Sequence, residues 1–363
     1  MLKRSPLILA LVAMFSVAVF AQSAYQVKQT PPVKLGTSGG NVNDISKAFC
    51  CSGTLGSLVT AGGTQYILSN NHVLARSDQA SPGEQISQPG LVDSSCRTTN
   101  SNIVANFAAA PKLGTQNVDA AVAATISGEV DTKGEILGVG VPASTVAAAA
   151  VGRGVAKAGR TTGLTCDTIA SVNTDVSVQY QKGCNQGKKF VISYTNQVVI
   201  NSTSFSAGGD SGSLIVTSDT AQPVALLFAG SSSTTIGNPI TDVVRALNIS
   251  FVGGNTHSVS CTGGTKPRPH MGISRSEFER ARIAKERNAH ALFTDEAVQG
   301  VGIGEDPDNP GLAVLMIYVE QGRAHQPIPA EIDGVKTVKI ITDRFRAYGW
   351  NERLDTGSCS KSE

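Results

Sequence analysis

The sequence predicts a mostly β-structured protein, an all-β barrel or sandwich followed by a small α+β unit. Hydrophobic residues make up 40% of its 363 residues, aromatic residues only 5%, and 38 residues are glycine, a profile that disfavours a helical bundle. Short apolar runs bounded by glycine, proline, asparagine or serine recur as far as about residue 252, which is typical of strands joined by tight turns. In this part of the chain, only Asp242 to Leu247 has a helical pattern.

The expected strands and helices follow in chain order. In the first part of the chain, the strand candidates are residues 53–59, 65–69, 118–126, 168–178, 189–194, 213–216 and 224–229. Beyond about residue 275, Ser276 and Glu279 have the spacing of a helix-capping pair, which predicts a helix to about Leu292. Three apolar strand candidates come after it, over 298–303, 312–319 and 335–341. The second part is therefore expected to be a small α+β domain.

Charge density separates these two parts of the chain. Residues 266–363 carry as many charged side chains as residues 1–265. Lys266-Pro267-Arg268-Pro269 stands where the density changes, and because proline stiffens the chain around it, this stretch predicts a linker. The expected organisation is an N-terminal segment 22–47, a β domain 48–265, a linker 266–275 and a domain of unassigned role at 276–363.

The first residues have the order of a secretory signal. Lys3 and Arg4 precede an apolar run over 7–20, and small residues follow it. Cleavage is expected after Ala21, with the next small residues as alternative sites, so residues 1–21 form the signal peptide. The apolar run has about 14 residues, fewer than the ~20 of a membrane-spanning helix. The mature protein is therefore expected to be secreted or periplasmic, without stable membrane insertion.

Cysteine usage agrees with export. The seven cysteines are Cys50, Cys51, Cys96, Cys166, Cys184, Cys261 and Cys359. They lack the paired spacings and histidine partners of a zinc site, so no metal is expected. In an oxidising compartment we expect Cys166 to pair with Cys184 across a short hairpin. Cys261 is expected to pair with Cys359 between the two domains, and Cys96 with either Cys50 or Cys51, which leaves one thiol over.

Charge and glycine motifs exclude several classes of partner. The net charge is only +2, from 30 basic and 28 acidic residues, so strong attraction to nucleic acid or anionic lipid is not expected. Gly300-Val301-Gly302-Ile303-Gly304 contains Gly-x-Gly-x-Gly, yet no helix is expected after it. A phosphate-binding loop needs the N-terminus of a following helix, so we expect neither nucleotide binding nor another cofactor.

A serine motif is the strongest candidate for chemistry. Gly208-Gly209-Asp210-Ser211-Gly212-Ser213 directly precedes an apolar strand. Because a hydroxyl is a poor nucleophile at neutral pH, it must stand on a tight turn beside a base, and flanking glycines permit such a turn. The backbone amides of Gly209 and Ser211 are then candidates for an oxyanion hole. Since Gly-Asp-Ser-Gly also occurs in ordinary turns, a purely structural turn is the alternative interpretation.

A histidine and an aspartate accompany it. His72 follows a hydrophobic strand in Ser69-Asn70-Asn71-His72, and Asp119 stands among apolar residues. Burying a carboxylate without partners is costly, and an imidazole N–H is a suitable donor for it. The alternatives are a structural histidine and an aspartate that caps its own strand.

The order His72, Asp119, Ser211 and the spacing between these residues resemble the chymotrypsin-like (trypsin-fold) serine peptidases over about residues 48–252. The resemblance implies two six-stranded antiparallel β-barrels that contribute the catalytic residues across a cleft. It further implies a secreted serine endopeptidase acting on a protein or peptide. His72 would be the general base and then the acid, Asp119 would orient its ring, and Ser211 would form the acyl-enzyme.

A second stretch narrows the resemblance. Gly159-Arg160-Thr161-Thr162-Gly163-Leu164-Thr165-Cys166 is similar to a segment of the small secreted bacterial peptidases of the α-lytic and streptogrisin kind. There an arginine pairs with the aspartate before the nucleophile, so Arg160 is expected to pair with Asp210 and support the oxyanion loop. A surface arginine in a β-turn is the alternative.

The sequence also departs from that family. Asn71 and Val73 flank the histidine, where Gly and Cys are usual. Ala229-Gly230-Ser231 stands where Ser-Gly-Gly usually walls the specificity pocket, and Phe205 lies six residues before the serine, where an acid would favour Lys or Arg substrates. We expect a pocket for small or modest apolar side chains. The departures keep open an alternative from another class, a catalytically weak or inactive binding module on a peptidase scaffold.

Overall fold

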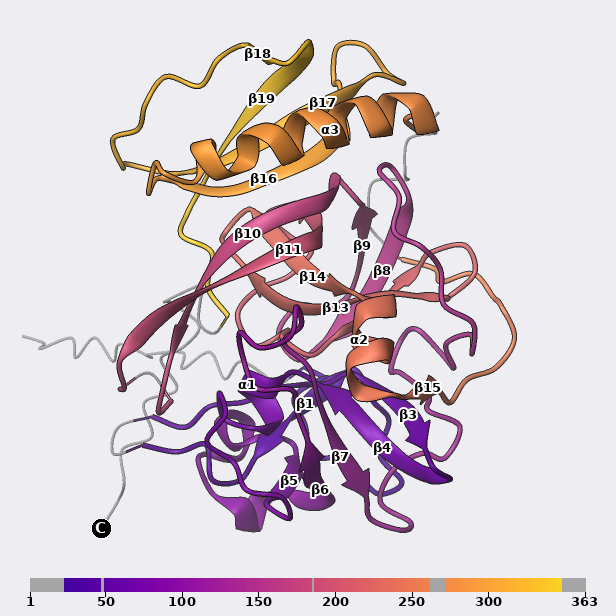
Figure 1. The fold of residues 1–363 in the computed structure, drawn as a ribbon. Helices are drawn as coiled ribbons and strands as arrows, with labels where there is room; N and C mark the ends of the chain where they lie inside the picture. The colour runs from indigo at the N-terminus through magenta and orange to yellow at the C-terminus, as the bar shows by residue number, and fades with distance from the viewer. Residues whose placement is uncertain (1–22, 47–48, 185, 262–271, 348–363) are drawn as a thin grey trace, which may run out of the picture.

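The structure is a computed structural model that describes residues 23–46, 49–184, 186–261 and 272–347. The expected signal peptide, most of the expected linker and Cys359 lie outside these residues. Among the described residues, the strands form two antiparallel-dominated sheets, and Figure 1 shows the first sheet at one end of the molecule and the C-terminal elements at the other.

The first sheet has eight strands within the described ranges, in the order β15-β3-β4-β7-β6-β5-β1-β2. They are β1 (Thr37–Asn41), β2 (Gly53–Leu55), β3 (Ser57–Ala61), β4 (Thr64–Ser69), β5 (Gln85–Gln88), β6 (Asn102–Ala109), β7 (Ala121–Thr125) and β15 (Ser250–Phe251). Short helices connect some of them, namely α1 (Asn71–Leu74) and the 3₁₀ turns η1 (Leu91–Ser94) and η2 (Thr98–Asn100). Buried aliphatic residues such as Leu58, Ile67 and Val104 fill its inner face, as alternating apolar strands dictate.

The second sheet begins with seven strands from the middle of the chain. They are β8 (Gly154–Gly159), β9 (Gly163–Thr168), β10 (Ser171–Gln181), β11 (Lys189–Asn201), β12 (Leu214–Thr217), β13 (Pro223–Gly230) and β14 (Thr234–Pro239). The helix α2 (Ile240–Leu247) follows β14 and matches the helical pattern in the sequence. β10 and β11 form a long hairpin, and alternate residues of β10, including Val176, Val178 and Tyr180, are buried.

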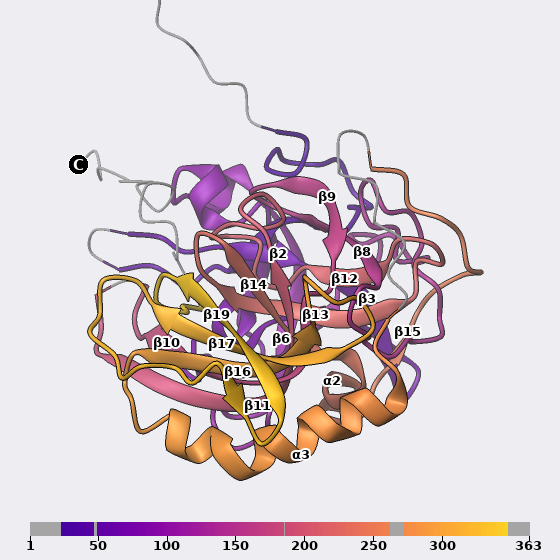
Figure 2. The same ribbon diagram turned by 90° about the horizontal axis from the view of Figure 1, so that it is seen from above.

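The C-terminal elements extend this second sheet. They are α3 (Arg275–Leu292), β16 (Val298–Glu305), β17 (Ala313–Glu320), β18 (Glu331–Ile332) and β19 (Val335–Thr342). β16 pairs antiparallel with β10, placing Gly300 opposite Val176. For the chain as described, the sheet reaches eleven strands in the order β18-β19-β17-β16-β10-β11-β14-β13-β12-β8-β9. Figure 2 shows α3 running along one side of these strands.

One apolar cluster joins the C-terminal elements to the second sheet. Tyr180 and Phe228 belong to the same buried cluster as Tyr318 and Phe345. The helix and the three main strands of the small α+β unit lie close to their expected residues, but the unit shares its sheet and core with the domain before it. The helix cap also differs from the expectation, because Ser274 accepts the capping bond from the amide of Glu277.

The described cysteines form three disulfides, which fit an oxidising, extracellular environment. Cys50 pairs with Cys96, one of the two expected alternatives. The expected Cys166–Cys184 and Cys261–Cys359 pairs are wrong, since Cys51 pairs with Cys184 and Cys166 with Cys261. The physical reason is that Cys166 lies on β9, away from the tip of the β10–β11 hairpin that carries Cys184. In the described part of the chain, no helix combines the length and apolarity needed to cross a membrane.

Candidate active site

His72 and Asp119 are brought together by the pairing of β4 and β7. Ser69, the last residue of β4, lies opposite Ala121, the first of β7, so the residues just outside both strands face each other. His72 Nδ1 lies 2.5 Å from Asp119 Oδ2, and the backbone amide of His72 donates to Asp119 Oδ1 at 3.2 Å. Both side chains are fully buried. The carboxylate therefore has the imidazole partner that its burial requires.

Tyr180 gives Asp119 a further donor. Its hydroxyl donates to Asp119 Oδ2 at 2.8 Å and lies 2.7 Å from the hydroxyl of Tyr194. Burial, followed by the nearby charge of Asp119, raises the pKa of Tyr180 well above its ordinary value, so the hydroxyl keeps its proton. Sequence reasoning missed this residue because the expected strand ended at residue 178. The apolar alternation of β10 continues to Tyr180 and was the available signal.

The backbone around Asp119 is also held from the second sheet. The Asp119 amide donates to Asn238 Oδ1 at 2.9 Å, and Asn70 Nδ2 donates to the Asp119 carbonyl oxygen at 2.7 Å. Asn71, one of the departures beside the histidine, donates through Nδ2 to Asp78 Oδ1 at 2.7 Å and to the carbonyl oxygen of Pro111 at 2.8 Å. Asn71 thus anchors a neighbouring loop.

Ser211 lies in a turn pressed against the strands that lead to His72. The Thr54 amide donates to the Ser211 carbonyl oxygen at 2.8 Å. A Cβ at Gly53 would lie 2.5 Å from the Val73 side chain and 2.9 Å from that same carbonyl oxygen, so Gly53 separates the serine turn from the residue after His72. Gly212 has φ +95°, and a Cβ there would lie 2.1 Å from Ser69 Oγ. Only glycine permits this approach.

The expected pairing of Arg160 with Asp210 is wrong. Asp210 is fully buried and its cationic neighbour is Lys157, whose Nζ lies 3.5 Å from Oδ2. Asp210 also accepts hydrogen bonds from the amides of Thr161, Thr162 and Ala207 at 2.8, 3.2 and 3.0 Å. Burial lowers the pKa of Lys157, and the Asp210 carboxylate opposes that shift. Lys157 was missed because a lysine within a short apolar strand resembles a solvent-facing residue.

Arg160 instead holds Asp93. Its Nε and Nη2 atoms donate to Asp93 Oδ2 and Oδ1 at 2.6 and 2.8 Å, a two-pronged ion pair. Asp93 lies in η1 and also accepts a hydrogen bond from Ser38 Oγ at 2.5 Å. Arg160 still lies beneath the serine turn, since a Cβ at Gly209 would lie 3.0 Å from its Nη1. Its charge is therefore paired with that of Asp93 in η1.

The expected pocket residues fall in two places. Ala229 and Gly230 end β13 and Ser231 follows them; Gly230 pairs with Arg346 beyond β19, and the Ser231 hydroxyl contacts that of Thr342 at the end of β19. The hydroxyl of Ser211 donates to the carbonyl oxygen of Ala347 at 3.1 Å, and Phe228 O lies 3.5 Å away. Phe205 is buried in the core of the second sheet, with Lys157 Nζ 5.8 Å from its ring centre. Its role in substrate selection stays a prediction.

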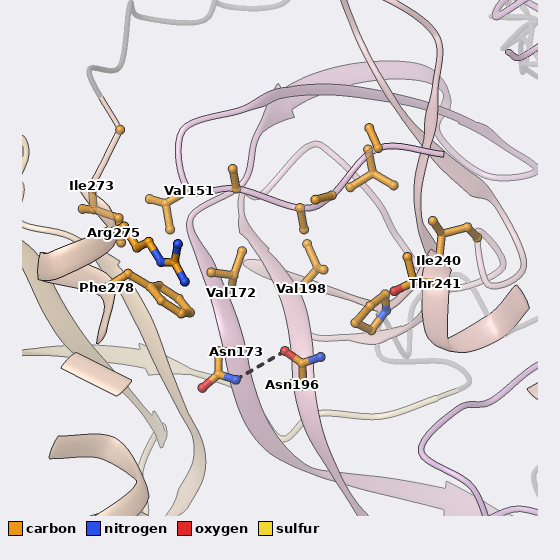
Figure 3. Close-up of a pocket in the computed structure, with 17 residues that line it drawn as sticks. Val151, Val172, Asn173, Asn196, Val198, Ile240, Thr241, Ile273, Arg275 and Phe278 are labelled. Carbon is orange, nitrogen blue, oxygen red and sulfur yellow. Dashed lines mark hydrogen bonds between the residues drawn. The ribbon is translucent and has the colours of Figure 1, made fainter. Parts of the chain in front are cut away.

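A cavity of about 510 Å³ lies elsewhere, beside the start of α3. Figure 3 shows its mainly aliphatic lining, which includes Val151, Val172 and Val198, and the hydrogen bond from Asn173 to Asn196. None of the candidate catalytic residues lines it.

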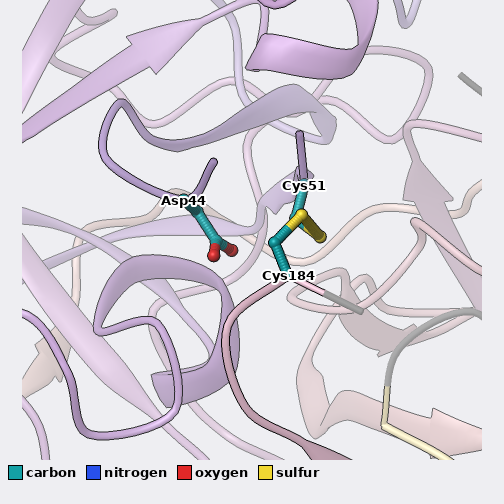
Figure 4. Close-up of side chains that lie close together, drawn as sticks. All are labelled: Asp44, Cys51 and Cys184. Carbon is teal, nitrogen blue, oxygen red and sulfur yellow. A yellow bond between two sulfur atoms is a disulfide. The ribbon is translucent and has the colours of Figure 1, made fainter. Parts of the chain in front are cut away.

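One group of potential metal ligands occurs among the described residues. Asp44, Cys51 and Cys184 lie within 4.8 Å of one another through their ligand atoms. Figure 4 shows the two sulfur atoms joined as a disulfide. Because a thiolate is the form of cysteine that binds a metal, this group is a structural crosslink.

Comparisons with known proteins concern the fold. No protein-family model matches the sequence, and no curated protein matches it. A glutamic-acid-specific serine protease of known structure is 20% identical, with a TM-score of 0.43, over 60% of this chain and 100% of that one. Thermobifida fusca protease A has 20% identity and a TM-score of 0.42 over 61% of this chain and 99% of its own. Cellulomonas bogoriensis chymotrypsin has 18% identity and a TM-score of 0.39 over 61% of this chain and 99% of its own.

The two curled, mainly antiparallel sheets confirm the expected mostly β architecture. His72 and Asp119 lie at strand ends of the first curled sheet, and Ser211 precedes β12 of the second. Both sheets exceed the expected six strands in the described chain. Short strands such as β2 and β15 lengthen the first sheet, and the C-terminal strands lengthen the second.

Proposed function

We propose that this protein is a secreted serine endopeptidase in which His72, Asp119 and Ser211 form the catalytic triad. The observation that carries the proposal is the buried His72–Asp119 pair, at 2.5 Å, next to a glycine-flanked serine turn. The buried Asp119 carboxylate accepts from an imidazole, a backbone amide and a tyrosine hydroxyl, and its negative charge would stabilise the imidazolium that forms when His72 takes up a proton.

The proposed mechanism follows from these positions. His72 accepts the proton of the Ser211 hydroxyl while Oγ attacks the peptide carbonyl carbon, forming a tetrahedral intermediate. The amides of Gly209 and Ser211 stabilise its oxyanion. The imidazolium, stabilised by Asp119, donates its proton to the leaving amine, which leaves an acyl-enzyme. Water, activated by His72 in turn, hydrolyses that ester and restores the serine hydroxyl. No cofactor takes part in these steps.

The substrate is proposed to be an extended protein or peptide segment. The backbone of Gly230 at the end of β13 offers an N–H and a C=O beside the Ser211 turn, which suits an extended chain bound as an added strand. Ser231 next to it narrows the pocket, so small or modest apolar side chains are favoured. The three described disulfides and the signal-like first residues support action outside the cytoplasm.

One observation favours the alternative, a binding module with an inactive site. Ser211 is fully buried in the full chain, and its hydroxyl donates to the chain's own Ala347. If this contact is permanent, the serine never meets a substrate.

Labelling with a fluorophosphonate probe tests the proposal. The purified full chain is incubated with the probe for a long period, and the modified residue is identified by mass spectrometry. Modification of Ser211 that disappears in the Ser211→Ala and His72→Ala variants supports the peptidase. Loss of a triad member lowers kcat by on the order of 10⁶. Ser211→Ala should therefore lose activity, while its melting temperature falls only slightly, through loss of the hydrogen bond to Ala347. Absence of labelling in every form whose cleft is open supports the binding module.

A further inference from the structure

The segment after β19 returns to the candidate active site. Residues 343–347 leave the last C-terminal strand and lie along the end of β13. The Arg346 amide donates to the Gly230 carbonyl oxygen at 2.9 Å, and the Gly230 amide donates to the Arg346 carbonyl oxygen at 3.0 Å. This reciprocal pair is the antiparallel pairing of neighbouring strands. It occupies the same backbone groups that an extended substrate needs.

The opposite edge of the segment is also paired. The Gln179 amide donates to the Phe345 carbonyl oxygen at 2.9 Å, and the Ala347 amide donates to the Gln179 carbonyl oxygen at 3.1 Å. The segment therefore runs as a short strand between β10 and β13, held through its backbone on both sides. Backbone pairing gives affinity with little dependence on side-chain identity, as in peptide recognition by strand addition.

The segment ends at the catalytic serine. The Ser211 hydroxyl donates its single proton to the Ala347 carbonyl oxygen at 3.1 Å, so in this arrangement that proton points at the chain itself. Ala347 is 1% exposed, and Ser211 is 0% exposed. A substrate carbonyl cannot reach Oγ without displacing the segment.

The C-terminal unit holds the segment in place. The Phe345 amide donates to Gln299 Oε1 on β16 at 2.6 Å, and the Phe345 ring packs 5.8 Å from that of Tyr318 on β17. Ser231 and Thr342 hydroxyls lie 2.5 Å apart. β16 in turn is paired with β10. The strand that attaches the C-terminal unit to β10 therefore also holds the segment in place.

We infer that the partner of the substrate groove in the full-length chain is its own segment 343–347, and that the C-terminal unit keeps the peptidase inhibited until this segment is displaced. The inference rests on the proposed function, because it regulates the same site. It gives the unit at 276–363 a role that the sequence left unassigned. When the segment leaves, the Ser211 hydroxyl loses the Ala347 carbonyl as its acceptor and becomes accessible from the groove.

The test compares full-length variants that differ in this segment. Arg346→Pro removes the amide that bonds Gly230, and Ala347→Asp places a charge at a buried apolar position, so either change expels the segment. Arg346→Ala is the matched control, since it keeps the backbone pairing. Two measurements are made on each protein, the rate of fluorophosphonate labelling at Ser211 and the hydrogen exchange of the Gly230 and Gln179 amides. Melting curves identify any variant that fails to fold. If either Arg346→Pro or Ala347→Asp does not fold, the comparison is made with the other of these two.

If the segment blocks the groove, Ser211 is labelled slowly and the Gly230 and Gln179 amides are protected in the wild type and in Arg346→Ala. In Arg346→Pro and Ala347→Asp, labelling is on the order of tenfold faster or more, and both amides exchange rapidly. Rapid labelling of Ser211 at the same rate in all four proteins overturns the inference and leaves the peptidase standing. Exposed amides without labelling in the two opened variants overturn the proposed function instead, and with it any inhibition, while the segment's place in the groove is upheld.

Discussion

The hydroxyl of Tyr180 donates to the same carboxylate oxygen of Asp119 that His72 Nδ1 contacts, at 2.8 and 2.5 Å respectively. Tyr180 lies on β10 of the second sheet, and Asp119 lies just before β7 of the first. The Asp119 Oδ2 atom therefore connects residues from the two sheets. Two donors on one oxygen fix the direction of the carboxylate, and hence the plane of the imidazole. β10 also pairs with β16, which connects the C-terminal unit to Asp119 through a single strand.

Tyr180→Phe is expected to lower kcat by on the order of tenfold with little change in KM, because it disturbs the position of His72 and leaves the groove intact. Unfolding free energy should fall by about 1.5–3 kcal/mol, the usual contribution of a hydrogen bond to a charged group. Peptide hydrolysis in the Arg346→Pro background and urea unfolding measure the two effects. Tyr194→Phe is the matched control, since it removes a buried hydroxyl but keeps the bond from Tyr180 to Asp119. Equal kcat losses in both variants would contradict a positioning role.

Alkaline pH should weaken the C-terminal unit through Tyr318. Burial raises the pKa of Tyr318 from 10.0 to about 12. Above pH 10 the unfolded chain releases this proton while the folded chain retains it, so stability is complete below pH 10 and is lost as pH rises toward 12. The loss amounts to about 1.4 kcal/mol for each pH unit in that window.

Urea unfolding of the wild type and Tyr318→Phe at pH 8 and pH 11 checks this sign. Between pH 8 and pH 11, the unfolding free energy of the wild type should fall by about 1.4 kcal/mol more than that of the variant, because the variant lacks the ionisable hydroxyl at position 318. A stability difference that stays constant between the two pH values would show that ionisation of Tyr318 is not linked to unfolding.

Much of the fold was predictable from local patterns. Turn-bounded apolar runs located most of the strands. The pairing of β16 with β10 was not predictable, because Val172 and Val176 of β10 show only that the strand is half buried. Which partner covers a free strand edge depends on the three-dimensional approach of distant segments.

In the site too, local motifs were predictable from the sequence and contacts between distant segments were not. His72, Asp119 and Ser211 stand in motifs with recognisable chemistry, and the structure brings the first two into contact. Asp210 was expected to pair with Arg160, but its cationic neighbour in the structure is Lys157. Because Lys157 and Arg160 are only three residues apart in the sequence, spacing alone cannot tell which of them reaches Asp210. The segment that occupies the groove carries no motif, because it is held by its backbone.

Lys157→Met should damage both stability and catalysis. Removing the buried ammonium leaves Asp210 charged and without a cation, which costs about 3–5 kcal/mol. The Asp210 carboxylate also receives the amides that shape the serine turn, so kcat should fall as the turn shifts. Thermal melts and peptide hydrolysis in the Arg346→Pro background measure the two losses.

Arg160→Ala is the matched comparison for that variant. It removes a cation of similar burial, but its partner is Asp93, outside the serine turn. The melting temperature should fall while kcat stays nearly unchanged. If Arg160→Ala lowers kcat as strongly as Lys157→Met, the oxyanion loop depends on Arg160 and the division of roles between the two cations is wrong.

Gly209→Ala should weaken oxyanion stabilisation by removing one of its two proposed donors. Gly209 has φ +96°, and an added Cβ would lie 2.5 Å from Thr161 Oγ1, which itself donates to the Gly208 carbonyl oxygen at 2.6 Å. Because Thr161 is fixed by that bond, the Gly209 peptide must rotate, and kcat should fall by about 10²–10³, as when one oxyanion donor is lost. Gly62→Ala is the control, since it has φ +56° with nothing within 4 Å of the added Cβ. It should cost only the roughly 1–2 kcal/mol of left-handed strain and leave kcat intact. A Gly209→Ala protein with wild-type kcat would mean that its amide does not face the oxyanion, and the donor would have to be sought elsewhere in the turn.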